Sequence, residues 1–477
     1  MKKIALLLSV VLSTHCMGRG IVSVKVSRAV CLLTFLQAAN DDPELSPTLR
    51  AYIRDHIPTA DSAKFAGIVH DFASLPLDFS YVIPGYPDSR LWPRRTLNLI
   101  SIAAVQATDT RDLMQRIIGI LPNEDWLKLG QVMDAAAPFY DKMIGKPFDA
   151  ATNKQLAALS QFTPKADDIF AHLKVFYGST WTSDIPFTIS MYPIPGTKGS
   201  SASPHSNSIM LGMLTEDKDP QMNLCIAIHE MCHMLYLEQS LALQKKIDGW
   251  FAGNSSVYSK YAYSYFDEAL ATASANGWAY KEMSGKMDKR HWYADDYIDG
   301  YGHAIYPMVT RYIAIGREID KAFVDSAIEL FGQRFPKAMY QYQNLFNNVS
   351  IYTDATDHAQ CISIVNAVEQ HFTMHNTGST YPIADEQTLS RMDNAAGSQL
   401  FIVHTAHEEN FKVLRTKFPQ LKDISSGSEG ITSFIDDRKR AIIIVNVKNL
   451  SRLEKAVNAL AASKEINPDK MFTAAGW

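Results

Sequence analysis

Apolar residues recur every three or four positions through the first third of the chain. Residues 27–40, 46–57 and 62–75 show this pattern, and Ser, Asp or Pro stands near several of their starts. Because a helix brings positions i, i+3, i+4 and i+7 to one face, the pattern predicts amphipathic helices. We expect an all-helical N-terminal region over residues 19–180.

The pattern changes around residues 185 to 214, where two short β-rich runs flank a segment of Gly, Ser and Pro. These features predict a hairpin with a long loop. An apolar run without Gly then follows, for which Asp219 is a plausible N-cap and Pro220 the first helical residue. A further helix can start near Ser264 and stop at Gly277, and helical patterns continue to about residue 345.

After residue 350, β-rich apolar runs alternate with helical patterns, which predicts a small C-terminal α/β domain over residues 346–477. The fold class expected for the whole chain is therefore α+β. Its middle part, residues 181–345, would be a mainly helical region with a small β-hairpin or sheet.

Composition excludes several classes of protein. The 477 residues carry 46 basic and 50 acidic side chains, a balance that gives no footprint for nucleic acid or an anionic membrane. No run approaches the roughly 18 to 20 apolar residues of a transmembrane helix. The five cysteines are too few and too scattered for a disulfide scaffold.

The first 18 residues have the pattern of a signal peptide. Lys2 and Lys3 precede a short apolar stretch, Ile4 to Leu12, which is too short to span a bilayer. We expect export to the periplasm or the medium. Attachment of a lipid to Cys16 is an alternative, although His15 before it is not the small residue that a lipoprotein cleavage site has.

The stretch HEMCH carries the strongest chemical signal. On a helix, positions i and i+4 share one face, so His229 and His233 can direct imidazole nitrogens at one metal ion. Glu230 stands one position round the helix, where a carboxylate can take a proton from a water that zinc has acidified. By chance, His-Glu-x-x-His would occur about 0.02 times in a chain of this composition. The alternative is a half-buried helix that holds two histidines.

A catalytic zinc usually has three protein ligands. A third histidine six residues beyond His233, as in metzincins, is absent because that position holds Gln239. A candidate donor is Glu268 in the stretch YFDEALATA, where small residues follow it and allow helices to pack closely. Asp267 is the rival donor, or a side chain that supports a ligand histidine.

HEMCH followed by DEALATA resembles the gluzincin group of zinc metallopeptidases, which includes thermolysin-like enzymes and M1-type aminopeptidases. The resemblance covers about residues 220–275. It implies a zincin-like catalytic domain over residues 181–345 in which His229, His233 and Glu268 bind Zn²⁺ and Glu230 is the catalytic base.

Such enzymes commonly use a Tyr or His downstream of the third ligand to stabilise the charge that develops on the carbonyl oxygen. Here Tyr301 and His303 are the leading candidates, with Tyr306 close by, and the alternative is ordinary aromatic packing. Peptide substrates of this group typically lie along an exposed strand edge. We expect that edge at residues 207–214, unless this strand only closes a small sheet.

These features predict an exported zinc metallopeptidase that acts on a peptide or protein. Two alternatives stay open, a zinc hydrolase that cleaves a non-peptide amide or ester, and a metal-binding scaffold protein without turnover. The sequence sets neither the substrate specificity nor the oligomeric state.

Overall fold

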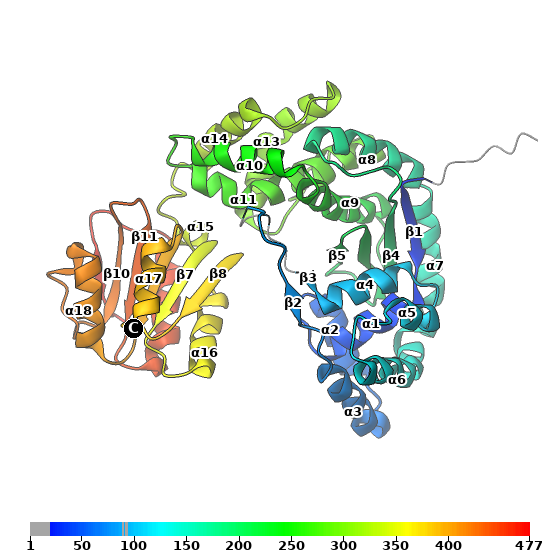
Figure 1. Ribbon diagram of the computed structural model, residues 1–477, viewed down its shortest axis with the longest axis horizontal. Coiled ribbons are helices and arrows are strands. Elements are labelled where there is room, and N and C mark those ends of the chain that lie inside the picture. The colour runs from blue at the N-terminus through cyan, green and yellow to red at the C-terminus, as the bar shows by residue number, and fades with distance from the viewer. Residues whose placement is uncertain (1–19, 88–89, 91–93) are drawn as a thin grey trace, which may run out of the picture. The chain divides into compact units, whose positions relative to one another are not determined.

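The computed structural model describes residues 20–87, 90 and 94–477 (Figure 1). The expected signal peptide, residues 1–18, and Cys16 lie outside these residues. The described chain combines helices with several sheets, in agreement with the α+β expectation. It divides into two compact units. The first runs to Gln244 and includes Ala273–Arg290 and Val309–Glu318, and the second comprises Lys245–Thr272, His291–Met308 and Ile319–Trp477.

The chain up to Leu237 forms most elements of the first unit. They are β1 (Val22–Val26), α1 (Arg28–Ala39), α2 (Pro47–His56), α3 (Ser62–Ala73), β2 (Ser80–Tyr81), β3 (Arg94–Arg95), α4 (Thr96–Gln106), α5 (Thr110–Arg116), α6 (Asn123–Tyr140), the π-helical turn η3 (Asp141–Gly145), α7 (Lys146–Ser160), α8 (Thr163–Tyr177), β4 (Phe187–Ile194), β5 (Ser201–His205), β6 (Ser208–Leu214) and α9 (Pro220–Leu237).

A four-stranded sheet in the order β1-β4-β6-β5 lies at the centre of this unit. β1 and β6 run parallel to β4, whereas β5 runs antiparallel to β6. Every residue of β4 and β6 is buried. Helices α1 and α4 pack on the sheet and on each other, and α7, α8 and α9 also contact its strands. Helices therefore cover both faces of the two inner strands.

Three expectations for this part are wrong. The region 19–180 is not all helical, because β1 pairs with β4 more than 150 residues later in the chain. Residues 185–214 do not form one hairpin, since β4 and β6 are parallel and the Gly/Ser/Pro segment itself supplies β5. The edge strands are β1 and β5, and Ser208–Leu214 lies inside the sheet as β6.

The remaining elements begin with α10 (Leu241–Ala252), α11 (Ser259–Ala271), the π-helical segment η4 (Thr272–Ala279), α12 (Tyr280–Ser284), α13 (Asp296–Ala314), α14 (Lys321–Arg334) and α15 (Tyr342–Phe346). The C-terminal part contains β7 (Asn348–Thr353), α16 (His358–Glu369), β8 (Asn376–Thr380), α17 (Glu386–Asn394), β9 (Ser398–Val403), α18 (His407–Lys417), β10 (Gly430–Ile435), β11 (Ala441–Asn446), α19 (Leu453–Ser463) and β12 (Phe472–Ala474).

The C-terminal strands form a six-stranded sheet in the order β12-β10-β11-β9-β7-β8, flanked by helices α16 to α19 (Figure 1). Strands β8, β7, β9 and β11 are parallel, and β10 runs antiparallel to β11 and β12. All residues of β9 and β11 are buried, as expected for parallel strands with helices on both faces. This confirms the alternation of strands and helices that the sequence pattern predicts.

Two further expectations can be checked over the described residues. None of their helices is long and apolar enough to cross a membrane. The four cysteines among them, Cys31, Cys225, Cys232 and Cys361, are buried and none takes part in a disulfide. The absence of a disulfide scaffold is therefore confirmed for this part of the chain.

Candidate metal centre

The helix that carries HEMCH begins where the sequence predicts. The carboxylate of Asp219 accepts a hydrogen bond from the backbone N–H of Met222 at 3.1 Å, and Pro220 occupies the first turn. An N-cap of this kind satisfies one of the N–H groups that the first turn leaves without a helical partner. The start of α9 is thereby fixed three turns before His229.

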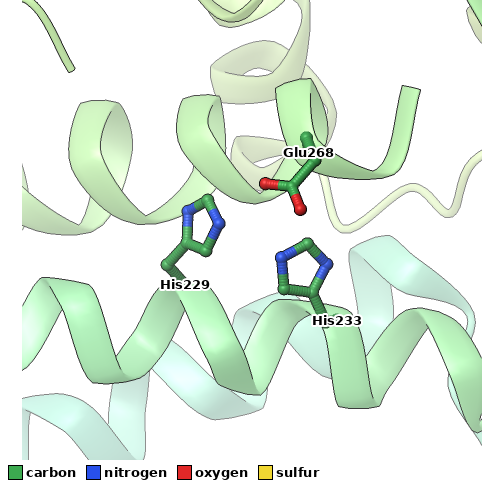
Figure 2. Close-up of side chains that lie close together, drawn as sticks. All are labelled: His229, His233 and Glu268. Carbon is green, nitrogen blue, oxygen red and sulfur yellow. The ribbon is translucent and has the colours of Figure 1, made fainter. Parts of the chain in front are cut away.

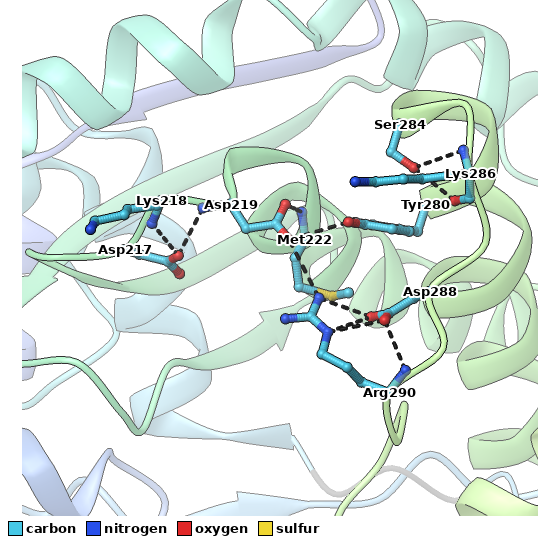
Figure 3. A network of polar contacts seen from close by, with 9 residues as sticks. All are labelled: Asp217, Lys218, Asp219, Met222, Tyr280, Ser284, Lys286, Asp288 and Arg290. Carbon is cyan, nitrogen blue, oxygen red and sulfur yellow. Dashed lines mark hydrogen bonds and ion pairs between the residues drawn. The ribbon is translucent and has the colours of Figure 1, made fainter.

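A polar network holds this helix start against a later part of the first unit (Figure 3). The second oxygen of Asp219 accepts hydrogen bonds from Tyr280 Oη at 3.2 Å and from Arg290 at 3.4 Å. Arg290 also pairs with Asp288 at 2.9 Å. Burial alone would raise the pKa of Asp288, but the hydrogen bonds from Arg290 hold it below its ordinary value. The network thus links α9 to residues 280–290.

His229 and His233 lie on consecutive turns of α9. Their ring centroids are 4.8 Å apart and the ring planes meet at 75°. His229 is buried with 8% of its surface exposed, and His233 is partly buried. Most of their helix neighbours, including Ile228, Met231 and Cys232, are buried and apolar. The two imidazoles and the neighbouring Glu230 therefore lie in an otherwise apolar stretch of helix.

Glu268 is a partly buried residue near the end of α11. The expected helix start and stop, Ser264 and Gly277, are wrong, because α11 begins at Ser259 and passes into the π-helical segment η4 after Ala271. Buried Phe266 packs edge-on against Phe323 of α14, with ring centroids 6.2 Å apart. This packing holds α11 against α14. Glu268 stands two residues after Phe266, so its side chain leaves α11 on a different side from the Phe266 ring.

The side chains of His229, His233 and Glu268 come together (Figure 2). Each offers one ligand atom, and these atoms all lie within 4.8 Å of one another. Figure 2 shows the Glu268 carboxylate directed from its helix toward the two rings. Asp267, the rival donor, is not part of this group. The three residues named from the sequence are thus a group that could hold a metal ion.

The donor set fits zinc. Two imidazole nitrogens and one carboxylate oxygen are the protein ligands of a common kind of catalytic zinc site, which keeps a further position open. The burial of His229 and the partial burial of His233 and Glu268 favour binding, because a cation stabilises a carboxylate that is partly withdrawn from water. Calcium or magnesium would instead require mainly oxygen ligands.

No family model, curated protein or solved structure matches this chain. The chemistry of the site is therefore argued from its residues and their geometry.

Glu230 follows His229 on α9 and is partly buried. Successive helical residues are separated by about 100° around the axis, so Glu230 cannot share the face of both histidines. It stands one residue after His229 and three residues before His233. This position suits a group that acts beside the metal ligands and does not replace one of them.

A glycine brings α13 close to the helix that carries Glu268. A Cβ on Gly302 would lie 3.1 Å from Thr272 Cγ2 and 3.5 Å from the carbonyl oxygen of Ala269. Ala269 directly follows Glu268. A side chain here would force Thr272 to shift, and the sequence pattern of α13 does not reveal this close approach.

Tyr301 and His303 flank this glycine, but neither belongs to the donor group. Tyr301 is fully buried, and its ring packs edge-on against Phe331 with centroids 5.1 Å apart. His303 has 40% of its side chain exposed and stacks on Trp292 with centroids 3.7 Å apart. Of the two candidates, His303 is therefore the one that solvent and a substrate can reach.

Asp299 orders the surroundings of His303. Its carboxylate lies 3.6 Å from His303 Nε2, and it accepts hydrogen bonds from His291 Nδ1 at 2.9 Å and from the backbone N–H of Trp292 at 2.7 Å. Burial would raise the pKa of Asp299, but these hydrogen bonds and the neighbouring His303 lower it. The ionised carboxylate positions both histidines, a role that sequence analysis missed.

Proposed function

We propose that this protein is an exported zinc-dependent metallopeptidase. The observation that carries the proposal is that the ligand atoms of His229, His233 and Glu268 lie within 4.8 Å of one another, although Glu268 stands 35 residues after His233 in the sequence. The sequence of residues 1–18 supports export, and the glutamate inside HEMCH supports turnover, because a purely structural metal site needs no base.

Each residue of the site would have a separate role in the reaction. His229, His233 and Glu268 would hold Zn²⁺, which when bound polarises a carbonyl group and lowers the pKa of water to about 7. Glu230 accepts the proton of the attacking water and passes it to the leaving amine. His303 would donate a hydrogen bond to the carbonyl oxygen as its negative charge develops.

The stacking of His303 on Trp292 and its contact with Asp299 support this role. An ionised carboxylate beside an imidazole fixes the orientation of the ring. Buried Tyr301 instead supports the helix from within, since its ring lies against Phe331.

Metal analysis tests the proposal first. We expect about one zinc per chain in the purified wild type by plasma mass spectrometry. Glu268→Ala should lose most of this zinc, whereas Asp267→Ala, a matched control at the neighbouring carboxylate, should keep it. Wild-type protein that stays folded but takes up no zinc would refute the metal site, and equal loss in both variants would refute the choice of Glu268.

A cleavage assay tests whether the zinc-loaded protein is a peptidase. The zinc-loaded protein should cleave members of a diverse peptide mixture, with products identified by mass spectrometry. Cleavage should stop on chelation and return with added zinc. A zinc-loaded protein that cleaves esters or non-peptide amides and no peptide would contradict the assigned substrate class while leaving the metal site intact.

A further inference from the structure

A cavity of about 110 Å³ lies beside the last turn of α9. The helix contributes Met234, Leu237 and Glu238 to its wall. Leu237 stands four residues after His233, and Met234 stands four residues after Glu230. Since a helix rises about 1.5 Å per residue, the cavity begins about 6 Å along the axis from the HEMCH side chains.

The lining also includes basic side chains. Arg90 and Arg94 line the cavity together with His205 at the end of the edge strand β5. Glu238 is the acidic residue among the lining side chains, so two guanidinium groups face one carboxylate. The remaining wall is mostly apolar and includes Ile83, Tyr86, Ile102 and Pro204.

Arg90 is held in place by the end of the motif helix. It is 5% exposed, and it donates to the carbonyl oxygen of Tyr236 at 2.9 Å and to Gln239 Oε1 at 3.3 Å. Its guanidinium also lies 3.2 Å from the centre of the Tyr236 ring. These partners are uncharged, and the Nε–H of Arg90 has no hydrogen-bond partner among the described residues.

His205 adds a second donor. Asn98 Oδ1 accepts the backbone N–H of Arg95 at 2.8 Å, so the amide nitrogen of Asn98 faces His205 Nδ1 at 3.1 Å. An amide NH₂ can only donate, so Nδ1 is the acceptor and the ring proton of the neutral imidazole resides on Nε2. This buried N–H has no partner in the part of the chain that the structure describes.

The residues that line the cavity therefore carry excess positive charge, and Arg90 and His205 among them each hold a buried N–H group that lacks an acceptor among the described residues. A buried donor without an acceptor is costly, and a carboxylate is the group that best satisfies guanidinium and imidazole donors together. The apolar wall suits the hydrocarbon stem of such a group. We propose that this cavity is a specificity pocket for a carboxylate of the substrate, borne by a residue next to the cleaved bond; the inference rests on the proposed peptidase function.

The carboxylate can come from a Glu side chain or from the free C-terminus of a peptide. Two pairs of acetylated peptides separate these sources. In the first pair the residue beside the cleaved bond is Glu or Gln and the C-terminus is amidated. In the second pair all side chains are neutral and the C-terminus is a free acid or an amide.

Each peptide is assayed with the wild type, with Arg94→Gln and with Arg95→Gln. Arg95 is the matched control, because it is the adjacent arginine, pairs with Glu44 at 3.2 Å and does not line the cavity. Retained zinc and an unchanged circular dichroism spectrum show that each variant is folded.

We expect kcat/KM to favour the acid in one pair by at least about tenfold, which corresponds to about 1.4 kcal/mol. This preference should fall to less than about threefold in Arg94→Gln and persist in Arg95→Gln. Cleavage without any preference for the acid, or equal loss in both variants, would overturn the pocket while leaving the peptidase proposal in place.

If no peptide is cleaved, the binding of the peptides tests the pocket without the reaction. Calorimetric titration of the same peptides into Glu230→Gln and into Glu230→Gln with Arg94→Gln reports the cavity directly. A preference for the acid that Arg94→Gln abolishes would support the pocket although the peptidase proposal had failed. Equal binding of acid and amide would overturn the pocket.

Discussion

The Asp219 carboxylate accepts a hydrogen bond from the backbone N–H of Met222 at 3.1 Å, and this contact fixes the first turn of the helix that carries His229 and His233. The same carboxylate lies 3.4 Å from Arg290. One side chain thus combines a helix cap with an ion pair that reaches another segment of the first unit.

Removal of the cap should destabilise the protein. We expect Asp219→Ala to lower the free energy of unfolding by about 1 to 2 kcal/mol, the usual range for loss of an N-cap. Asp219→Asn keeps the cap acceptor but loses the charge and the second oxygen, which accepts from Tyr280 and Arg290, so its cost should be smaller. Urea unfolding measures the stability of both variants. Equal losses in the two variants would mean that the contacts of the second oxygen, and not the cap, stabilise α9.

Glu230→Gln should separate catalysis from metal binding. The amide has nearly the same shape as the carboxylate but cannot accept a proton, so hydrolysis should fall by about 100-fold to 10,000-fold. Zinc content should stay at the wild-type level, because Glu230 is not among the donor atoms that meet. Glu216→Gln is the control, since Glu216 is exposed in the loop before α9. Loss of zinc in Glu230→Gln would instead make this residue a ligand.

Gly302 should not tolerate a side chain. Valine at this position would press on Thr272 and Ala269, and overpacking of this kind typically costs about 1 to 3 kcal/mol. Since Ala269 follows Glu268, zinc affinity should fall as well. At Gly249, inside α10, a Cβ would meet nothing within 4 Å. Gly249→Ala should therefore stabilise the protein by about 0.5 to 1 kcal/mol. Calorimetric melting of Gly302→Val and of Gly249→Ala measures the two opposite changes in stability, and zinc titration of both variants measures the change in zinc affinity.

The local features of the site were predictable from the sequence. Asp219, Pro220 and the spacing of His229 and His233 are short-range signals, because a cap and an i, i+4 pair depend only on neighbouring residues. Glu268 was identified through its small neighbours and a resemblance, and the structure brings it to the histidines. The small residues after it mark the close approach of another helix, which Gly302 makes.

The long-range features could not be predicted. β1 is a short, half-polar strand whose partner β4 stands more than 150 residues away, so no local periodicity reveals it. The segment that became β5 has the Gly, Ser and Pro content of a loop, yet hydrogen bonds to β6 make it a strand. Tertiary pairing of this kind overrides local preference. The basic cavity depends on such pairing too, because His205 stands at the end of β5.

Burial of His205 should make stability depend on pH. Burial lowers the pKa of this histidine to about 4, whereas in the unfolded chain it titrates near its ordinary value of 6.5. Between these values the unfolded state binds the proton and the folded state does not. Stability therefore falls as the pH drops through this window, and the contribution of the neutral ring is fully present above about pH 6.5. At pH 5 the loss should be about 2 kcal/mol relative to pH 7.5.

The variant His205→Gln tests this dependence, because glutamine cannot take up the proton. Urea unfolding at pH 5 and at pH 7.5 should show a smaller difference for the variant than for the wild type, by about 2 kcal/mol. His172→Gln is the control, since His172 is exposed on α8 and should leave the difference unchanged. The same pH dependence in the wild type and in His205→Gln would show that other groups cause it. His205 would then be in contact with solvent or with an acceptor in the folded protein, and the donor assigned to the cavity would be lost.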